Sequence, residues 1–471
     1  MFTPTATTTT TCTSSLRLVL SITLALLAVA CTQAADAAPS TFADGDRVAF
    51  IGDSITHGGF YAPNVMLFYA TRYPERSITW SNCGISGDYT GGVLQRFDWD
   101  IAPHTPTVAV VMLGMNDVGR DLYGMPDPSK QIQDQRRWNL EGYAKNLAAL
   151  TARLEELQTN VILVTPSIYD QTCAVGQKNY PGVDDALTTC SATVAAVAAK
   201  RGLPVVDFHA PMVALNAKQQ AIDPSFTIIG ADRVHPSGPG ELVMAYLFLK
   251  AQGITPTVAT IAIDAAQAKA LTADNCTISD LSTSGGDLTF TVLEKSLPFP
   301  IFKHQQPALA LIPFIEELDR ETLRIAGLGA GRWKVSIDDK LVATCTGQEL
   351  ADGINLATND RTPQYAQALR VADSNFKRQA IVAGKLRAIA CVHHSRLVKA
   401  GVAIDDFAAA QKVLQSMLAS EKNDYVRGLM QTYVDWKPKE AALKAEVAGL
   451  DATMLVDAKP IALRFHITAV H

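Results

Sequence analysis

The chain has 471 residues, of which 48% are hydrophobic and 18% are charged, and its formal net charge is −5. This composition is typical of a globular protein with a large core, and it excludes both a disordered chain and a strongly basic nucleic-acid-binding protein. A chain of this length predicts two domains.

The N-terminus has the pattern of an export signal. Its apolar run, residues 18–30, is short for a membrane span but suits the core of a signal peptide. Cleavage is expected after Ala35-Asp36-Ala37; the alternative is a lipoprotein signal to residue 30, with Cys31 as the lipidated residue. We therefore expect residues 1–37 to be a signal peptide. The mature protein would be exported as a periplasmic, extracellular or lipid-anchored protein without a transmembrane span.

Residues 45–255 show alternating strand and helix patterns. Strands are predicted at residues 47–51, 77–80, 108–113, 161–165 and 204–208, and helices at residues 140–157, 186–200 and 240–251. The third strand is nearly all apolar, as expected for a strand buried on both faces. The first of these helices has Tyr143 and five leucines at three- and four-residue steps, which gives it one apolar face. This alternation predicts a parallel sheet covered by helices on both faces.

The pattern changes beyond residue 256, and residues 256–471 are predicted to form an accessory domain. Short strands are predicted at residues 277–281, 287–293, 322–326, 332–337 and 461–467. Helical periodicity appears at residues 404–418 and 426–433, and Asn423 between them allows one long helix or a hairpin. The predicted architecture is a β-rich domain with a helical insertion and a returning final strand.

Six of the eight cysteines follow the predicted cleavage point. An even number in an exported chain permits disulfide bonds. Cys173 and Cys190 bracket one polar loop and are the expected pair, with buried free thiols as the alternative. No Cys-x-x-Cys pair occurs, so neither a zinc site nor a redox motif is predicted. No cofactor is expected.

Four short polar segments carry the candidate chemistry. Three follow predicted strands: residues 52–56 (GDSIT), 82–88 (NCGISGD) and 114–117 (GMND). The fourth, residues 232–236 (DRVHP), precedes the last helix of the first domain. Because ligands bind beyond the carboxyl ends of the strands in parallel α/β sheets, these segments predict one site.

The residue types in these segments suit acyl transfer. A serine hydroxyl needs a base to remove its proton, and a carboxylate on the other side of that base orients it and stabilises its charged form. Ser54, His235 and Asp232 supply this set. The tetrahedral intermediate also needs donors for its oxyanion, which Gly87, Asn116 and the Ser54 N–H can provide.

In this order the segments resemble the four blocks of SGNH hydrolases, a branch of the GDSL esterases and lipases. The resemblance covers residues 45–255, with Ile55 where the GDSL motif has leucine. It implies a flavodoxin-like three-layer α/β fold and no metal. Its implied roles are the nucleophile for Ser54, the acid and base for Asp232 and His235, and the oxyanion hole for Ser54, Gly87 and Asn116.

The resemblance implies a serine ester hydrolase that forms an acyl-enzyme. Export and the resemblance together imply substrates such as acetyl or other short acyl esters, including acylated glycans. The alternatives are a lipid or lysophospholipid esterase and a noncatalytic glycan-binding protein on a hydrolase scaffold. Nothing in the sequence indicates an oligomeric state.

Other polar residues near these segments are predicted to be structural. Gly84 is a second choice for the oxyanion donor, and Arg120 either contacts substrate or is solvated. Structural roles are expected for Asp53, His57, Asp88, Asp117, Asp207, His209, His393 and His394.

Overall fold

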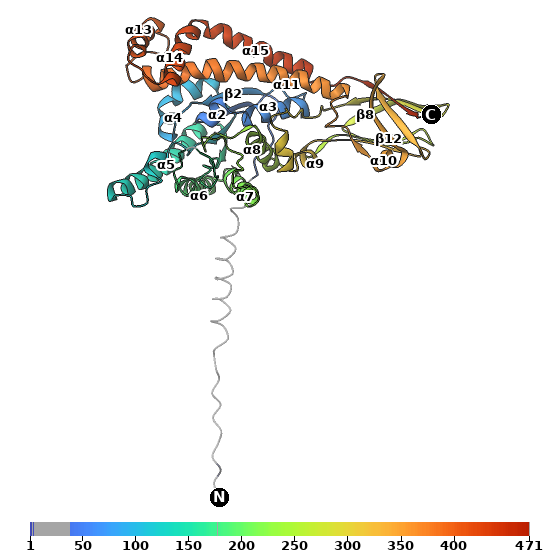
Figure 1. The fold of residues 1–471 in the computed structure, drawn as a ribbon, viewed down its shortest axis with the longest axis horizontal. Helices are drawn as coiled ribbons and strands as arrows, with labels where there is room; N and C mark the ends of the chain where they lie inside the picture. Colours follow the sequence, from blue (N-terminus) through green and yellow to red (C-terminus); the bar gives the residue numbers. More distant parts are fainter. Residues whose placement is uncertain (2, 4–37, 177, 471) are drawn as a thin grey trace.

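The computed structural model describes residues 1, 3, 38–176 and 178–470. Apart from residues 1 and 3, the predicted signal peptide lies outside the described residues, and so does Cys31. An α/β part and a β-rich part lie end to end, and a group of helices runs along one side of the α/β part (Figure 1). Within the described ranges, no helix is both long and apolar enough to cross a bilayer.

The α/β part is built on a five-stranded parallel sheet in the order β2-β1-β3-β4-β5. Its strands are β1 (Arg47–Gly52), β2 (Thr79–Gly84), β3 (Val108–Met112), β4 (Asn160–Val164) and β5 (Val205–Val206). This is the flavodoxin-like order, so the predicted fold class is confirmed. The second strand begins and ends later than predicted, so residues 82–84 lie inside β2 rather than after it.

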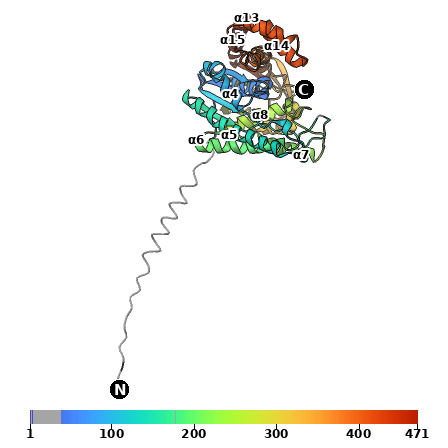
Figure 2. The same ribbon diagram turned by 90° about the vertical axis from the view of Figure 1, so that its left-hand side faces the viewer.

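Helices cover both faces of this sheet. They are α2 (Ser54–Gly58), α3 (Tyr61–Arg72), α4 (Thr90–Arg96), α5 (Lys130–Glu156), α6 (Val183–Arg201), α7 (His209–Gln220) and α8 (Gly238–Ala251). Helix α3 packs against α8, while α5 packs between α4 and α6. Right-handed crossovers in this strand order place these two sets on opposite faces. Figure 2, in which the left-hand side of Figure 1 faces the viewer, shows α4, α5 and α6 together.

The carboxyl ends of the central strands are aligned. Gly52 pairs in register with Gly84 on one side and with Met112 on the other. The three polar segments therefore leave the sheet at one edge, as the sequence predicts. Glycine is needed at position 52, because a Cβ there would lie 2.2 Å from the Thr56 hydroxyl and 2.8 Å from the Met112 carbonyl oxygen.

The β-rich part holds two sheets, in the orders β13-β10-β6-β7 and β12-β11-β14-β9-β8. The strands are β6 (Thr257–Asp264), β7 (Lys269–Asp274), β8 (Cys276–Ser284), β9 (Asp287–Glu294), β10 (Arg320–Ala326), β11 (Arg332–Ile337), β12 (Lys340–Thr346), β13 (Ile354–Asn355) and β14 (Leu463–Ala469). A separate apolar core forms from both sheets, with Phe290 stacked on Phe465. The last strand returns between β9 and β11, as predicted.

The helical insertion lies between β13 and β14. It contains α11 (Pro363–Ile381), η5 (Val382–Arg387), α12 (Ala388–Val392), η6 (His393–Leu397), α13 (Phe407–Leu418), α14 (Asp424–Trp436), η7 (Lys437–Lys439) and α15 (Glu440–Asp457). Short helices elsewhere in this half are η4 (Gln306–Ala310), α9 (Phe314–Leu318) and α10 (Gly347–Asp352). Of the two predicted alternatives, the structure has two helices, and Asn423 caps α14.

Helix α11 was not predicted, although it is the longest helix of the insertion. It begins at Pro363 after the capping residue Thr362, whose hydroxyl accepts from the Tyr365 N–H. Its buried face includes polar side chains: Gln364, Gln367, Ser374, Asn375, Arg378 and Gln379. Because these polar side chains share the buried face with only a few apolar ones (Ala368, Val371, Ala372 and Ile381), the apolar period is short and the helix was missed.

Residues beyond 256 also contribute to the core of the α/β part. This core includes the apolar side chains Leu297, Phe299, Phe314, Leu318, Val371 and Met454. Helix α11 packs along α3 and α15, so the insertion lies on the α/β part and not only on the β-rich part (Figure 1). The division at residue 256 stays a prediction, since the two parts share packed surface.

The expected Cys173–Cys190 disulfide is wrong. All six described cysteines are free thiols. Cys173 Sγ lies 3.2 Å from the Ser225 carbonyl oxygen, whereas Cys190 lies fully buried on α6. The two thiols therefore belong to different environments, and the alternative of buried free thiols holds.

A buried pair of carboxyl groups, Glu294 and Glu321, predicts an unusual pH dependence of stability. Burial and the neighbouring Glu321 carboxyl raise the pKa of Glu294 well above its usual value. A carboxyl group with a raised pKa keeps its proton in the folded state at pH values where the unfolded chain releases it. Its contribution to the free energy of unfolding is therefore fully present below about pH 4.5 and is lost as the pH rises. The Glu294→Gln variant should therefore gain on the order of 1–3 kcal/mol in unfolding free energy at pH 8 and little at pH 4.

Urea unfolding of both proteins between pH 4 and pH 8 measures this difference. The exposed Glu446 on α15 provides the control, because its change to glutamine should leave the unfolding free energy unchanged. Parallel pH profiles for the wild type and Glu294→Gln would contradict the prediction.

Candidate active site

Ser54 lies at the start of α2, directly beyond the end of β1. Asp53 caps this helix, because its carboxylate accepts the Ile55 N–H at 2.9 Å. Burial raises the pKa of Asp53 to about 7 despite this hydrogen bond. The cap fixes the turn so that the Ser54 side chain stands at the open edge of the sheet, half-buried.

His235 and Asp232 reach Ser54 from a loop 181 residues away in the sequence. His235 Nε2 lies 2.8 Å from Ser54 Oγ, and His235 Nδ1 lies 2.5 Å from Asp232 Oδ2. The side chains of His235 and Asp232 are 48% and 52% exposed. The three predicted residues thus form a continuous hydrogen-bonded row that is open to solvent.

The loop that carries His235 and Asp232 is held by two sets of hydrogen bonds. Asp232 Oδ1 accepts the N–H groups of Val234 and His235, both at 3.0 Å. The buried Arg233 has a φ of 66°, and its guanidinium donates to the carbonyls of Asp170, Cys173 and Val175. The loop is therefore anchored by the residue between acid and base, which sequence reasoning did not single out.

The charge state of Asp232 is set by its partners. Burial raises its pKa, but the hydrogen bonds from the His235 side chain and from the two backbone N–H groups outweigh this effect, and the net shift is downward. The ionised carboxylate can only accept hydrogen bonds, so the His235 Nδ1 carries a proton and donates it. His235 Nε2 is then the acceptor for the Ser54 hydroxyl.

The predicted oxyanion donors lie at the same edge. Gly87 has a φ of 79° in the loop between β2 and α4, a conformation that favours glycine. Asn116 follows β3, and its Nδ2 donates one hydrogen to the Asp88 carbonyl at 2.8 Å. Within the described residues, neither Gly87 nor Ser54 uses its backbone N–H in a hydrogen bond to the protein. These N–H groups and the second Asn116 amide hydrogen are therefore available to an anion.

Gly84 has a structural role instead. Its N–H already donates to the Asn82 side chain at 2.9 Å, so it is not available to an oxyanion. A Cβ at this position would lie 2.3 Å from the His57 backbone nitrogen. Glycine is required here because β2 and α2 approach closely.

Other residues that the sequence singled out are bound within the protein. The Asp117 carboxylate accepts from the Thr90 N–H and hydroxyl at the start of α4, and burial raises its pKa to about 6. Asp207 accepts from the Thr165 hydroxyl at 2.8 Å. His209 lies 3.1 Å from the Thr188 hydroxyl and is buried. These contacts stabilise the turns around the site.

The His393-His394 pair does not form a metal site. His393 is buried against Trp99 and His394 faces Asp88, 3.5 Å away. In the part of the chain that the structure describes, no group of three or more His, Cys, Asp or Glu side chains could hold a metal ion.

Sequence reasoning missed the charged residues behind the site. Arg96 is fully buried and bonds to Asp88 and Asp100, and Arg387 from the helical insertion also binds Asp100. No motif marks these residues. The only signal is a pair of arginines in segments that become buried, which cannot be recognised before the fold is known.

A sheet in the 2-1-3-4-5 order with a Ser-His-Asp row and backbone donors at its carboxyl edge defines an α/β acyl hydrolase. Residues 50–242 match the model of the GDSL-like Lipase/Acylhydrolase family. A solved structure described as BT4096, a gut microbial diltiazem-metabolizing enzyme, is 33% identical and covers 92% of this chain and 99% of its own, with a TM-score of 0.85. The chain therefore belongs to the GDSL-like lipase/acylhydrolase family.

A second relative is an acetylxylan esterase from Geobacillus stearothermophilus. It is 28% identical over 224 residues, which are 44% of this chain and 94% of the esterase. Together these comparisons identify the protein as a carboxylic ester hydrolase. The match to the gut microbial enzyme extends over the C-terminal half, whereas the match to the acetylxylan esterase is less than half of this chain.

Proposed function

We propose that the protein hydrolyses esters through an acyl-enzyme on Ser54 and that it removes acetyl or other short acyl groups from carbohydrate. The observation that carries the mechanism is the hydrogen-bonded row of Ser54, His235 and Asp232, with spans of 2.8 and 2.5 Å. The observation that supports the substrate class is the acetylxylan esterase relative.

The reaction proceeds in two steps. His235 Nε2 takes the proton of the Ser54 hydroxyl as its oxygen attacks the ester carbonyl, and the oxyanion forms beside the N–H groups of Ser54 and Gly87 and the Asn116 amide. His235 then gives the proton to the departing alcohol. Water attacks the acyl-Ser54 ester with His235 as base again, which releases the acid and restores the hydroxyl. Asp232 holds the His235 tautomer and stabilises its charged form.

The surroundings of Asn116 suit a hydrophilic substrate. A pocket of about 260 Å³ borders Asn116 and is lined also by Gly119, Arg120, Asp121 and Leu122. Within the described residues the Arg120 guanidinium has no ion-pair partner, so it is available to hydroxyl or carbonyl oxygens of a sugar. A polar, open pocket favours a short acyl group on a polar alcohol over a long acyl chain.

A substrate panel tests this proposal. We expect kcat/KM to fall by about 10-fold or more from p-nitrophenyl acetate to the octanoate, and we expect acetate release from acetylated xylooligosaccharides. Diltiazem and a lysophospholipid complete the panel. A fluorophosphonate should stop all turnover and label the peptide that contains Ser54.

Two outcomes would contradict parts of the proposal. Preference for the octanoate or the lysophospholipid would reject the short-acyl substrate class. Turnover that survives complete labelling of Ser54 would reject the serine mechanism itself.

A further inference from the structure

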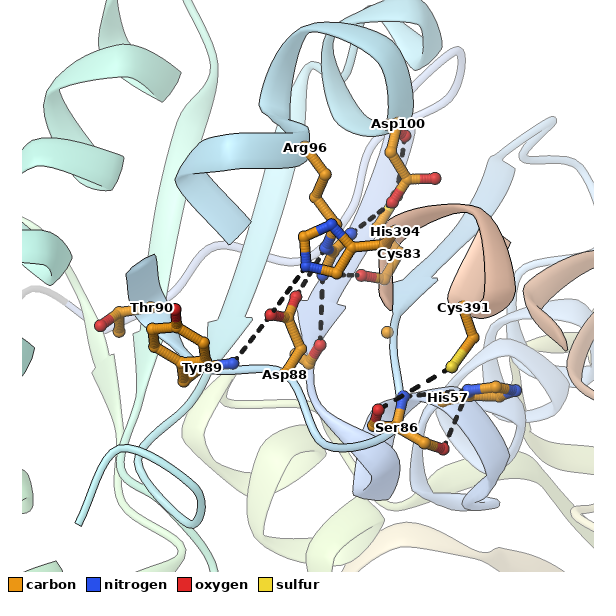
Figure 3. A network of polar contacts seen from close by, with 12 residues as sticks. His57, Cys83, Ser86, Asp88, Tyr89, Thr90, Arg96, Asp100, Cys391 and His394 are labelled. Carbon is orange, nitrogen blue, oxygen red and sulfur yellow. Dashed lines mark hydrogen bonds and ion pairs between the residues drawn. The ribbon is translucent and has the colours of Figure 1, made fainter. Parts of the chain in front are cut away.

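The helical insertion packs against the loop that carries Gly87. This oxyanion loop (residues 84–88) joins β2 to α4, and a short stretch of the insertion, the brace (residues 383–394), lies against it. Figure 3 shows Cys391 and His394 of the brace beside Ser86 and Asp88 of the loop. The brace comes from about 300 residues later in the chain, as the Arg387 and Gly84 contact shows.

Arg387 is the main contact of the brace. Its Nε donates to the Gly84 carbonyl at 2.9 Å, and its two terminal nitrogens bind both oxygens of Asp100 at 2.7 and 2.8 Å. Arg387 is buried, with 6% exposure. One side chain thus links the insertion to the first residue of the oxyanion loop through one hydrogen bond and to Asp100 through two more.

Further contacts connect Arg387 to two of the three predicted oxyanion donors, Gly87 and Asn116. Asp100 is also bonded to Arg96, and Arg96 Nε donates to Asp88 Oδ2 at 2.6 Å. The Asp88 carbonyl in turn accepts from Asn116 Nδ2, and Asp88 directly follows Gly87. The row Arg387–Asp100–Arg96–Asp88 therefore ends beside Gly87 and Asn116, two of the three predicted oxyanion donors. Figure 3 shows its members Asp100, Arg96 and Asp88.

This row is balanced in charge and excluded from water. It holds two arginines and two aspartates, and each side chain is at most 7% exposed. Despite the cost of burial, the Arg387 and Arg96 guanidiniums hold the pKa of Asp100 well below its usual value. Because a buried charge without its partner is strongly unfavourable, the four side chains have few alternative arrangements.

His57 forms a second connection between the brace and the loop. Its Nδ1 lies 3.2 Å from the Ser86 nitrogen and 3.1 Å from the Ser86 hydroxyl, while its Nε2 lies 3.0 Å from the Ala383 carbonyl oxygen. Burial lowers the pKa of His57 to about 4, so the ring is neutral near pH 7. The neutral ring accepts from the Ser86 N–H at Nδ1 and donates to Ala383 at Nε2.

The brace itself makes two further contacts with the loop. His394 Nε2 lies 3.5 Å from Asp88 Oδ1, and the Cys391 thiol lies 3.9 Å from the Ser86 carbonyl oxygen. Ser86 and Asp88 thus both contact the brace, on either side of Gly87. Gly87 lies between them, and within the described residues its N–H has no hydrogen-bond partner.

We propose that the brace is a positioning element for the oxyanion hole, in which Arg387 holds Gly87 and Asn116 in place through Asp100, Arg96 and Asp88. This inference rests on the proposed serine mechanism. The helical insertion is then part of the catalytic unit and not a separate module. Removing the Arg387 contacts should reduce stabilisation of the tetrahedral intermediate while substrate binding in the ground state is retained.

The Arg387→Lys variant tests this inference, with Arg378→Lys as its matched control. Arg378 is equally buried, lies on the adjoining α11, binds Asp451 and donates to the β2 carbonyl of Trp80 at 2.7 Å. It therefore makes the same kind of link to the same strand without touching the oxyanion loop. Lysine keeps the charge in both variants but loses the paired guanidinium bonds.

We expect Arg387→Lys to lower kcat on p-nitrophenyl acetate by about 10- to 100-fold with KM nearly unchanged. The inhibition constant of a trifluoromethyl ketone, which forms an oxyanion adduct, should rise by the same factor. Arg378→Lys should lower the melting temperature and keep kcat. Asn116→Ala provides the scale for losing a complete donor, about 10²- to 10³-fold.

A second brace variant covers the case in which Arg387→Lys does not fold. His394→Leu removes the contact with Asp88 from a side chain that is 12% exposed, and we expect a kcat loss of about 3- to 10-fold with the same parallel rise in the ketone inhibition constant. An equal kcat loss in Arg378→Lys, or unchanged kcat in the folded brace variants, would overturn the inference. With an inactive Ser54→Ala, either result leaves the serine mechanism standing. An active Ser54→Ala would overturn both.

Discussion

Ser54→Ala should lose at least about 10⁴-fold in kcat on p-nitrophenyl acetate while it keeps the fold. The change removes only the hydroxyl that lies 2.8 Å from His235 Nε2. The cap of α2 is unaffected, because it is made by the Asp53 side chain and the Ile55 N–H. The residual rate reports what the oxyanion donors contribute to direct attack by water.

The measurement is steady-state hydrolysis together with thermal unfolding and fluorophosphonate labelling. A suitable control is Ser282→Ala, an exposed serine on β8, which should keep full activity and full labelling. Activity within about 10-fold of the wild type in Ser54→Ala would contradict the assignment of Ser54 as nucleophile.

Asp232→Asn should lose about 10³- to 10⁴-fold in kcat, which is less than Ser54→Ala. The oxygen of the new amide should keep the position of Asp232 Oδ1, because the N–H groups of Val234 and His235 point at it from 3.0 Å. The amide NH₂ then faces His235 Nδ1, which must become an acceptor. The ring proton moves to Nε2, so His235 can no longer accept the proton of Ser54.

The histidine tautomer can be measured directly by ¹⁵N NMR of labelled protein. We expect the His235 proton on Nδ1 in the wild type and on Nε2 in the variant. Asp232→Glu, which keeps an acceptor, should retain more activity than Asp232→Asn. Loss of less than about 10-fold in Asp232→Asn would show that the carboxylate does not control the tautomer.

The strands and the site segments of the first domain could be predicted from local sequence. The strand predicted at residues 108–113 is β3 (Val108–Met112) in the structure, and it is apolar throughout because both its faces are covered. The predicted edge of the sheet is confirmed by the register of Gly52 with Gly84 and Met112. The chemical roles of the five site residues stay predictions, although the structure brings them together.

Other features could not be predicted, each for a physical reason. Helix α11 buries Arg378 and Gln379 against the α/β part alongside only a few apolar side chains, so its apolar period is short. The predicted disulfide bond was wrong because the spacing of Cys173 and Cys190 along the sequence says nothing about their environments in the fold. Strands β6, β7, β12 and β13 were missed; every residue of β7 is exposed, so it lacks a buried stripe.

The sequence by itself determined the class of fold, the family and the segments that carry the candidate chemistry, because these depend on local patterns of apolar residues, glycines and polar turns. Only the tertiary structure decided that His235 meets Ser54 across 181 residues and that Arg387 reaches the oxyanion loop. The physical reason is that hydrogen bonds and ion pairs between distant segments depend on where the folded backbone places a few single side chains, and such contacts impose no repeating pattern on the sequence.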